Sequence, residues 1–308
     1  MSSKKLIVLG SVNADHVLRV DTFPRPGETV TGSGYRVIPG GKGANQAVAA
    51  ARLGAGIAFI ACVGDDDFGR RMVDAFAADG MDTGAVMTVP GVPTGVALIQ
   101  VAEGGENSIA ISAEANAHLT ADALAPHLPL VREADTLLMQ LESPMETIRT
   151  AAREAARAGG RVILNPAPAR PLPDELLADL SLITPNETEA ELLTGVRVES
   201  AADAERAADI LLGKGVDSVI ITLGARGALY KGPEGCREIG GFSVSPVDTT
   251  AAGDTFNGAL AAALQGGEAI FPAIRLAHGA AAISVTRMGA QTSIPTRKEV
   301  DEFMRKNG

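Results

Sequence analysis

Short apolar runs alternate along the chain with longer, alanine-rich amphipathic stretches. The short runs are bounded by Gly, Pro or Asn and most are continuously apolar, which is typical of parallel strands covered on both faces. Strands that alternate with helices predict an α/β fold with a mostly parallel sheet. The predicted strands are Lys5–Leu9, Ile57–Val63, Thr136–Leu141, Val162–Leu164, Leu182–Thr184 and Ser218–Leu223.

Two of the intervening helices have recognisable ends. Ser143–Glu146 has the spacing of a capping box, with proline at its first helical position, and Gly159–Gly160 stands where that helix should end. Ser200–Asp203 predicts the start of a second helix, and either Gly213 or Gly215 is expected to close it.

Residues 13–38 and 94–112 interrupt this alternation because they lack helical periodicity. Their four short apolar segments predict strands that could pair into a separate small sheet, suited to a lid over an active site or to a subunit interface. An antiparallel extension at the edge of the main sheet fits the pattern equally well. No linker is long enough to separate domains, so we expect one α/β domain over residues 1–308. The four predicted strands are His16–Val20, Thr29–Val37, Thr94–Val101 and Asn107–Ser112.

Acidic residues outnumber basic ones, 37 to 27, which gives a formal net charge of −10. This charge argues against nucleic-acid partners and anionic membrane surfaces. An acidic protein must bind anions through local devices such as helix N-termini and loop amides. No apolar run has the length of a secretory signal or a membrane helix. Cys62 and Cys236 are too few for a disulfide scaffold, and each is expected to be a partly buried apolar group. A cytoplasmic protein is therefore expected.

Three common glycine or serine motifs are absent from this glycine-rich chain. Gly41–Lys42 is the nearest match to a Walker phosphate loop, but Arg36 occupies the first glycine position and Gly43 follows the lysine. The first predicted strand continues as Gly10–Asn13, which is not a dinucleotide fingerprint. A GxSxG nucleophile elbow is also absent. These absences count against a P-loop NTPase, a NAD oxidoreductase and a serine hydrolase of that type.

The segment Val247–Leu260 contains the clearest candidate chemistry. Small and apolar residues repeat at helical spacing from Gly253, so residues 251–254 should lie at a helix start. The unpaired amides of Ala251, Ala252 and Gly253 could then stabilise the charge on a transferring phosphoryl group. Asp254 would repel that group, so it is interpreted as the base that accepts a proton from an attacking hydroxyl. The alternative is an ordinary helix whose N-terminal aspartate is favoured by the helix dipole.

A second glycine-rich turn, within Pro39–Gly54, also leads into a helix. Lys42 and Asn45 place polar groups beside bare backbone there, as recognition of a polyol requires. A flexible turn with an ordinary lysine is the alternative.

Together these segments resemble the ribokinase family of carbohydrate kinases, also called the phosphofructokinase B family. Gly40–Gly69 is similar to the family's N-terminal signature and Asp248–Leu260 to its C-terminal signature. The resemblance implies a three-layer αβα sandwich with a small β-sheet lid. It also implies ATP-dependent transfer of a phosphoryl group to the 5-hydroxyl of a sugar, most closely D-ribose. Further matching segments are Gly10–Asp15, Phe23–Val30, Leu138–Ser143, Asn165–Ala169, Ile183–Ala190 and Thr222–Gly227.

The resemblance also implies roles for individual residues. Asn13 and Asp15 would hold ribose hydroxyls, and the acceptor-only carboxylate of Asp15 suits a vicinal pair of hydroxyl donors. Glu142 would contact the sugar or support the metal and its water shell. The rest of the implied sugar pocket consists of Gly41, Lys42, Asn45 and Asp254. The implied nucleotide-binding residues are Asn186, Thr222, Gly224, Gly227, Gly253 and His278.

Two kinds of cation and a dimer follow from the same resemblance. Mg²⁺ would be held largely by phosphate oxygens and water. A monovalent cation, potassium, would bind mostly to backbone carbonyls, and the homodimer would form through the lid. One departure is Glu114, which stands where the family pattern predicts glycine and so affects the local turn. The implied positions around the monovalent cation are Asp248, Thr250, Ser284, Arg287, Gly289 and Ser293.

Other functions also fit a scaffold of this kind. A kinase for deoxyribose, for another sugar such as fructose, or for a nucleoside would use the same chemistry. A non-catalytic sugar sensor is a different class, but the presence of both Asp254 and the amides of 251–253 argues against it, because a sensor needs no base.

Overall fold

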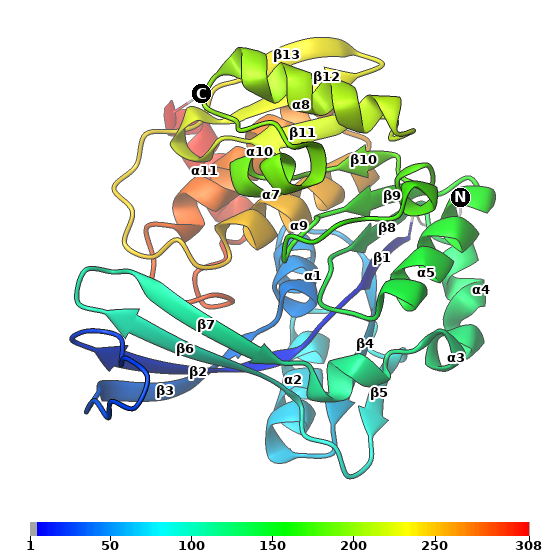
Figure 1. The fold of residues 1–308 in the computed structure, drawn as a ribbon. Helices are drawn as coiled ribbons and strands as arrows, with labels where there is room; N and C mark the ends of the chain where they lie inside the picture. The colour runs from blue at the N-terminus through cyan, green and yellow to red at the C-terminus, as the bar shows by residue number, and fades with distance from the viewer. Residues whose placement is uncertain (1–4, 308) are drawn as a thin grey trace.

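The central feature of the protein is a nine-stranded sheet with the order β13-β12-β11-β10-β9-β8-β1-β4-β5 (Figure 1). The computed structural model describes residues 5–307. All six strands predicted for this sheet are present and pair in parallel. The strands are β1 Leu6–Leu9, β4 Ile57–Gly64, β5 Val86–Val89, β8 Thr136–Met139, β9 Arg161–Leu164, β10 Leu182–Ile183, β11 Val219–Thr222, β12 Ala228–Gly232 and β13 Gly235–Ile239.

Helices cover both faces of this sheet, which confirms the three-layer αβα architecture (Figure 1). In β1, Leu6 and Val8 pack into one core whereas Ile7 and Leu9 pack into the other. Burial on both faces explains why the strand runs are continuously apolar. One face carries α1 Lys42–Arg52, α2 Asp67–Ala78, α9 Ala252–Gln265, α10 Ile270–Ser284 and α11 Arg297–Asn307. The other carries α3 Ala121–Leu124, α4 Leu128–Arg132, α5 Met145–Arg157, α6 Asp174–Leu177, α7 Glu187–Thr194 and α8 Ala201–Gly213.

A separate four-stranded sheet projects from the body as the lid (Figure 1). Its order is β3-β2-β6-β7, with β2 parallel to β6 and the other pairs antiparallel. This arrangement excludes the edge extension considered above. Asn13 is the root of the lid, because it pairs with Gly40 on one side and with Gly95 on the other. The lid strands are β2 Asn13–Val20, β3 Ser33–Gly40, β6 Gly95–Ala102 and β7 Asn107–Ser112.

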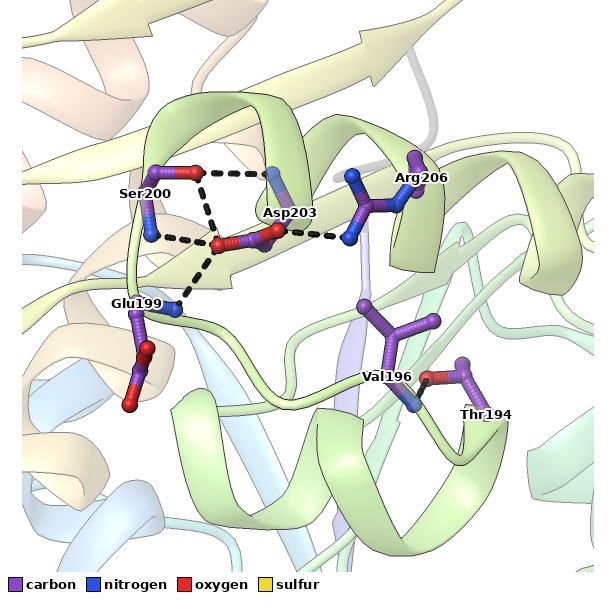
Figure 2. A network of polar contacts seen from close by, with 6 residues as sticks. All are labelled: Thr194, Val196, Glu199, Ser200, Asp203 and Arg206. Atoms are coloured by element: carbon purple, nitrogen blue, oxygen red, sulfur yellow. Dashed lines mark hydrogen bonds and ion pairs between the residues drawn. The ribbon is translucent and has the colours of Figure 1, made fainter.

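The predicted start of α8 is confirmed, and Ser200 and Asp203 form a capping box there (Figure 2). The N–H of Asp203 donates to the hydroxyl of Ser200 at 3.2 Å, and the Asp203 carboxylate accepts from the N–H of Ser200 at 2.8 Å. The same carboxylate pairs with Arg206, one turn along the helix. The helix ends at Gly213, and Gly215 then adopts a left-handed φ of 100°.

The capping box predicted for Ser143–Glu146 is wrong. Helix α5 begins at Met145 with Pro144 as its N-cap residue, so the proline stands just before the first helical turn and not within it. The buried hydroxyl of Ser143 therefore has no hydrogen-bond partner among the described residues. The predicted end of the helix is confirmed, because Gly159 turns the chain with a φ of 84°.

The two cysteines lie in different environments. Cys62 is buried in β4, as expected. Cys236 is exposed, contrary to expectation, because it belongs to β13 at the open edge of the main sheet. Within residues 5–307, no helix combines the length and apolar character needed to cross a membrane.

Candidate active site

The site begins where the order of the main sheet reverses. Strand β1 pairs with β4 on one side and with β8 on the other, and such a reversal opens a crevice at the carboxyl ends of the strands. Ser11 follows β1 and Glu142 follows β8 into this crevice. The Ser11 hydroxyl donates to the Glu142 carboxylate at 2.5 Å, and the same oxygen accepts from the N–H of Lys42 at 3.0 Å. Glu142 is therefore half-buried and joins three segments.

Gly41 makes the sharp turn from the lid into α1. Its φ is 91°, and an added Cβ would lie 2.7 Å from the backbone nitrogen of Asn13. Glycine is therefore required both by the backbone conformation and by the close approach. The turn places Lys42 and Asn45, in the first turn of α1, beside the root of the lid.

The first turn of α9 confirms the helix start predicted at 251–254. Ala251 is the N-cap residue in a left-handed conformation, with a φ of 58°. The N–H of Ala252 already donates to the carbonyl of Thr249 at 3.3 Å, so this amide is partly engaged. The N–H groups of Gly253 and Asp254 have no acceptor among the described residues. Two open amides at a helix N-terminus form an environment that attracts anions.

Asp254 lies just inside this first turn and is only 6% exposed. One carboxylate oxygen accepts from the side-chain amide of Asn45 and the other from that of Gln46, each at 2.9 Å. The side-chain oxygen of Asn45 is buried with no partner among the described residues. Asn45 therefore offers a ready acceptor for a ligand hydroxyl beside the carboxylate.

The side chain of Asn13 is buried, and it is oriented by Asn116, which is not among the predicted site residues. The side-chain amide of Asn116 donates to the Asn13 side-chain oxygen at 2.8 Å, while its own oxygen accepts from the N–H of Val12 at 2.9 Å. Asn116 follows Glu114, which adopts a left-handed φ of 45°. This conformation costs a non-glycine residue roughly 1–2 kcal/mol and explains why glycine was expected there. The unusual residue at position 114, two residues before a polar side chain, was the only indication of Asn116 in the sequence.

Four of the residues implied for the sugar pocket are charged and interact electrostatically: Asp15, Lys42, Glu142 and Asp254. Burial, together with the nearby charges of Glu142 and Asp254, raises the pKa of Asp15 from 3.8 to about 7. Burial alone would lower the pKa of Lys42, but the surrounding carboxylates, Asp254 first among them, raise it above its ordinary value. A fixed ammonium among carboxylates suits a neutral ligand with many hydroxyl groups, because such a ligand needs both donors and acceptors.

The carboxyl ends of β10 and β11 bring most of the nucleotide-side candidates together. Asn186 and Thr222 form a bridge between the two strand ends. Asn186 also caps α7 in a box with Glu189, whose pKa is raised by burial. Glu189 was missed as a site residue, although the Asn-x-x-Glu spacing of a capping box was available in the sequence.

Gly224 and Gly227 form the turn between β11 and β12. Their φ angles are 56° and 101°. An added Cβ at Gly227 would clash with the carbonyl of Ile239, so glycine is required there by the fold itself. This turn lies on the same edge of the sheet as Thr222.

His278 lies on α10. It is 8% exposed and packs against Phe256 of α9, with ring centroids 4.9 Å apart. Burial, with a smaller effect from Arg275, lowers its pKa to about 4, so the imidazole is neutral at pH 7. Its Nε2 has no partner among the described residues, which leaves this nitrogen available to a ligand.

The structure brings three of the positions implied for a monovalent cation into one loop cluster: Asp248, Thr250 and Gly289. The Asp248 carboxylate accepts from the N–H groups of Thr250 and Gly289, each at 2.9 Å. The backbone N–H groups of 247 and 248 both donate to the carbonyl of Val285. Burial of Asp248 opposes its ionisation, but the hydrogen bonds from Thr250 and Gly289 outweigh it and lower its pKa. The carboxylate therefore stays ionised at neutral pH.

The side chains of three other implied positions have hydrogen-bond or ion-pair partners of their own. The hydroxyls of Ser284 and Ser293 donate to the carbonyls of Ala281 and Ala290, and Arg287 pairs with Glu299. Backbone carbonyls and one carboxylate suit a monovalent cation. No group of three or more His, Cys, Asp or Glu side chains within residues 5–307 could hold a metal ion.

The pfkB family carbohydrate kinase model matches residues 3–297. The chain belongs to this family. It is 52% identical over 301 residues to the ribokinase of Haemophilus influenzae, covering 98% of each protein.

Two solved structures agree with this assignment to the pfkB family. The ribokinase of Thermotoga maritima has a TM-score of 0.90 and 42% identity, covering 98% of this chain and 99% of that one. The Arabidopsis thaliana ribokinase complexed with ribose and ATP has a TM-score of 0.90 and 32% identity, covering 99% of both. The protein is thus a carbohydrate kinase, a phosphotransferase.

A cleft of about 870 Å³ separates the lid of this pfkB kinase from its body. Asp15, Arg36 and Ile99 line it from the lid, and residues 248–250 line it from the body. The cleft therefore extends from Asp15, implied for the sugar, to Asp248, Thr250 and Gly289, implied for the monovalent cation.

Proposed function

We propose that this kinase transfers the γ-phosphoryl group of ATP to the 5-hydroxyl of D-ribose, giving ribose 5-phosphate and ADP. The observation that carries the proposal is the buried Asp254 carboxylate beside the open N–H groups of Gly253 and Asp254. A proton acceptor and an anion site thus lie within one helical turn. The 52% identity to the Haemophilus influenzae ribokinase and the likeness to the Arabidopsis thaliana ribokinase complexed with ribose and ATP support the choice of substrates.

The reaction assigns a separate task to each part of this turn. The 5-hydroxyl oxygen forms a bond to the γ-phosphorus as Asp254 accepts its proton, and the bond between that phosphorus and the ADP oxygen breaks. The amides of Gly253 and Asp254 stabilise the charge on the transferring group, with the partly engaged amide of Ala252 beside them. Asn186, Thr222, Gly224, Gly227 and His278 are assigned to ATP. Mg²⁺, held largely by phosphate oxygens and water, would neutralise part of the phosphate charge.

Asp15 is the residue that we assign to sugar selection. Its buried carboxylate accepts hydrogen bonds only, which matches two adjacent hydroxyl donors better than the single hydroxyl of 2-deoxyribose. Asn13, Gly41, Lys42, Asn45 and Glu142 complete the proposed pocket. An ADP-release assay over a panel of pentoses, hexoses and nucleosides tests this assignment. D-ribose should give the highest kcat/KM, and a higher value for another sugar or a nucleoside would contradict the proposal.

The raised pKa of Asp15 predicts a specific pH dependence. Its pKa of about 7 in the folded protein means that the carboxylate needed for ribose is lost as the pH falls below 7. Because kcat/KM reports the free enzyme, its value for ribose should fall about tenfold per pH unit below that point. Unfolded Asp15 titrates near 3.8, so the native state binds more protons between pH 4 and 7, and ligand-free stability falls as the pH rises through this window.

Steady-state kinetics from pH 5 to 8 measure the first effect, and thermal unfolding over the same range measures the second. In Asp15→Asn the limb near pH 7 should disappear from the residual activity. A wild-type kcat/KM that stays flat between pH 5 and 7 would contradict the assignment.

We further propose that potassium binds at the Asp248 loop cluster and activates the enzyme. Asp248 is the one anionic member of the proposed set, whose other members, Thr250, Ser284, Arg287, Gly289 and Ser293, would contribute backbone carbonyls. Asp248→Asn is expected to raise the half-maximal potassium concentration at least tenfold, as measured by activity titrated with potassium at constant ionic strength. An unchanged half-maximal concentration would place the cation elsewhere. Potassium and ATP are both abundant in the cytoplasm, where we propose that the protein works.

We also propose that the protein forms a homodimer through its lid. Register places Val37, His16 and Leu98 in one row on the face opposite Asp15, and Leu98 is 57% exposed. Exposed apolar groups on one sheet face favour a partner, and we propose the lid of a second copy. Leu98→Lys should shift sedimentation from dimer to monomer. The control Leu192→Lys alters a leucine on α7 that is 47% exposed, and it should not change the sedimentation. A monomeric wild type would contradict the proposal.

A further inference from the structure

Gln46 is a fully buried side chain whose amide group is completely engaged. Its Nε2 donates to Asp254 Oδ1 at 2.9 Å and to Asn165 Oδ1 at 3.0 Å, and its Oε1 accepts from Gln140 Nε2 at 2.7 Å. Both amide hydrogens and the carbonyl oxygen therefore have partners. Gln46 lies within the Gly40–Gly69 signature, but it is not among the predicted site residues.

The neighbours of Gln46 fix the direction in which its amide points. A reversed amide would place Oε1 against the oxygens of Asp254 and Asn165, which now accept from Nε2. Gln140 follows β8 and Asn165 follows β9, at the carboxyl edge of the central strands. The network therefore ties Asp254, on α9, to a rigid part of the sheet.

Close packing of α1 against α9 determines the distance between the Gln46 amide and the Asp254 carboxylate. Gly258, one turn after Asp254, lies against α1, and an added Cβ there would be less than 3 Å from the carbonyl of Gln46 and from the Cβ of Ala49. A larger residue at this position would push α9 away from α1. Glycine therefore keeps the Gln46 amide within hydrogen-bonding distance of the carboxylate.

We infer that Gln46 is a positioning residue that holds the Asp254 carboxylate in its ionised, proton-accepting form. A donor aimed at a carboxylate stabilises its charged form, and the effect is strongest where water is excluded. The inference rests on the proposed function, in which Asp254 is the base. Gln46 itself touches neither substrate in this scheme, and it acts only through Asp254.

Several charged groups oppose or assist this effect. Asp15 on β2 and Glu189 on α7 are like charges that interact with Asp254, and Glu142 after β8 belongs to the same cluster through Asp15 and Lys42. Lys42 on α1 favours the ionised form. Without the donor from Gln46, the acidic neighbours are opposed by Lys42, by the amide of Asn45 and by the N-terminal end of α9.

The test is the pH profile of kcat at saturating ribose, ATP and Mg²⁺ for Gln46→Met, which preserves length but removes the donor. A hydrogen bond to a charged group has a strength equivalent to about one to two pH units, so the acid limb should move to higher pH by that amount. The KM for ATP should not change. Gln46→Glu, which has the same shape, places a carboxyl against Asp254 and should move the limb further.

A second readout does not depend on turnover. The ¹³C resonance of the Asp254 carboxyl, identified by its absence in Asp254→Asn, should titrate at higher pH in Gln46→Glu and Gln46→Met than in the wild type. Gln140→Met is the matched control, because it removes the same chemical group but leaves the Gln46–Asp254 bond in place. Its shift should be smaller than that of Gln46→Met.

The outcomes separate the inference from the proposed function. If a Gln46 variant folds, as shown by its thermal unfolding, and neither its acid limb nor its ¹³C titration moves, Gln46 has only a packing role and the inference is wrong. If Asp254→Asn keeps its turnover, the proposed function fails first. If Asp254→Asn is inactive and both readouts move in Gln46→Met, both proposals are supported.

Discussion

Asp254→Asn is expected to lower kcat by a factor of about 10²–10⁴, the range associated with a positioned general base. Asparagine has nearly the same shape but cannot accept the proton from the 5-hydroxyl. Its amide would also face a donor from Asn45 or Gln46, which now supply hydrogen bonds at 2.9 Å. The KM for ATP should change little, because the open amides of the helix start belong to the backbone. Steady-state kinetics and calorimetric titration with ATP measure the two effects.

Asp301→Asn is a matched control for the loss of one negative charge. Asp301 lies on α11 and pairs with Arg297, on the surface and outside the site cluster. Its kcat should equal that of the wild type. If Asp254→Asn kept a kcat within threefold of the wild type, another group would have to accept the proton. The interpretation of Asp254 as an ordinary aspartate at the N-terminus of a helix, favoured by the helix dipole, would then be preferred.

Elements of the fold that are encoded locally could be predicted from the sequence. Strands β1, β4 and β8 are buried on both faces, so each forms an apolar run whose meaning does not depend on distant residues. The hairpin of β12 and β13 was missed for the opposite reason. Four of the five residues of β13 are exposed, and its sequence of Gly, Cys, Arg, Glu and Ile shows no apolar pattern. An exposed edge strand such as β13 is recognisable only from its pairing with the neighbouring strand, β12.

The candidate active site also has parts that local sequence predicts and parts that it does not. The helix starts at Gly41 and Ala251 follow from local glycine and alanine patterns, and both are present. The contacts that join them are not local. Gln46 and Asp254 are 208 residues apart in sequence, and Asn13 and Asn116 are 103 apart. A polar residue inside an amphipathic helix carries no local sign that its amide meets a carboxylate, so only the folded chain identifies these partners.

Gly43→Ala is expected to reduce both stability and activity. Gly43 lies in the first turn of α1, where an added Cβ would be less than 3 Å from backbone atoms of Gly10 and Ser11. Those atoms follow the central strand β1 and cannot move without disturbing the sheet. In an open helix the same substitution would stabilise by about 1 kcal/mol, but overpacking costs about 1–3 kcal/mol and should exceed that gain. The displaced α1 would also carry Lys42 and Asn45 away from Asp254, so kcat/KM should fall.

Chemical denaturation of Gly43→Ala beside Gly56→Ala decides whether backbone contact is the cause. Gly56 is exposed, has no left-handed φ, and has no atom within 4 Å of an added Cβ. Its replacement should leave stability unchanged or raise it by about 0.4–1 kcal/mol, because alanine restricts the unfolded chain. If Gly43→Ala were as stable and as active as Gly56→Ala, then α1 could shift freely against β1. The close contact at Gly43 would then not fix the positions of Lys42 and Asn45.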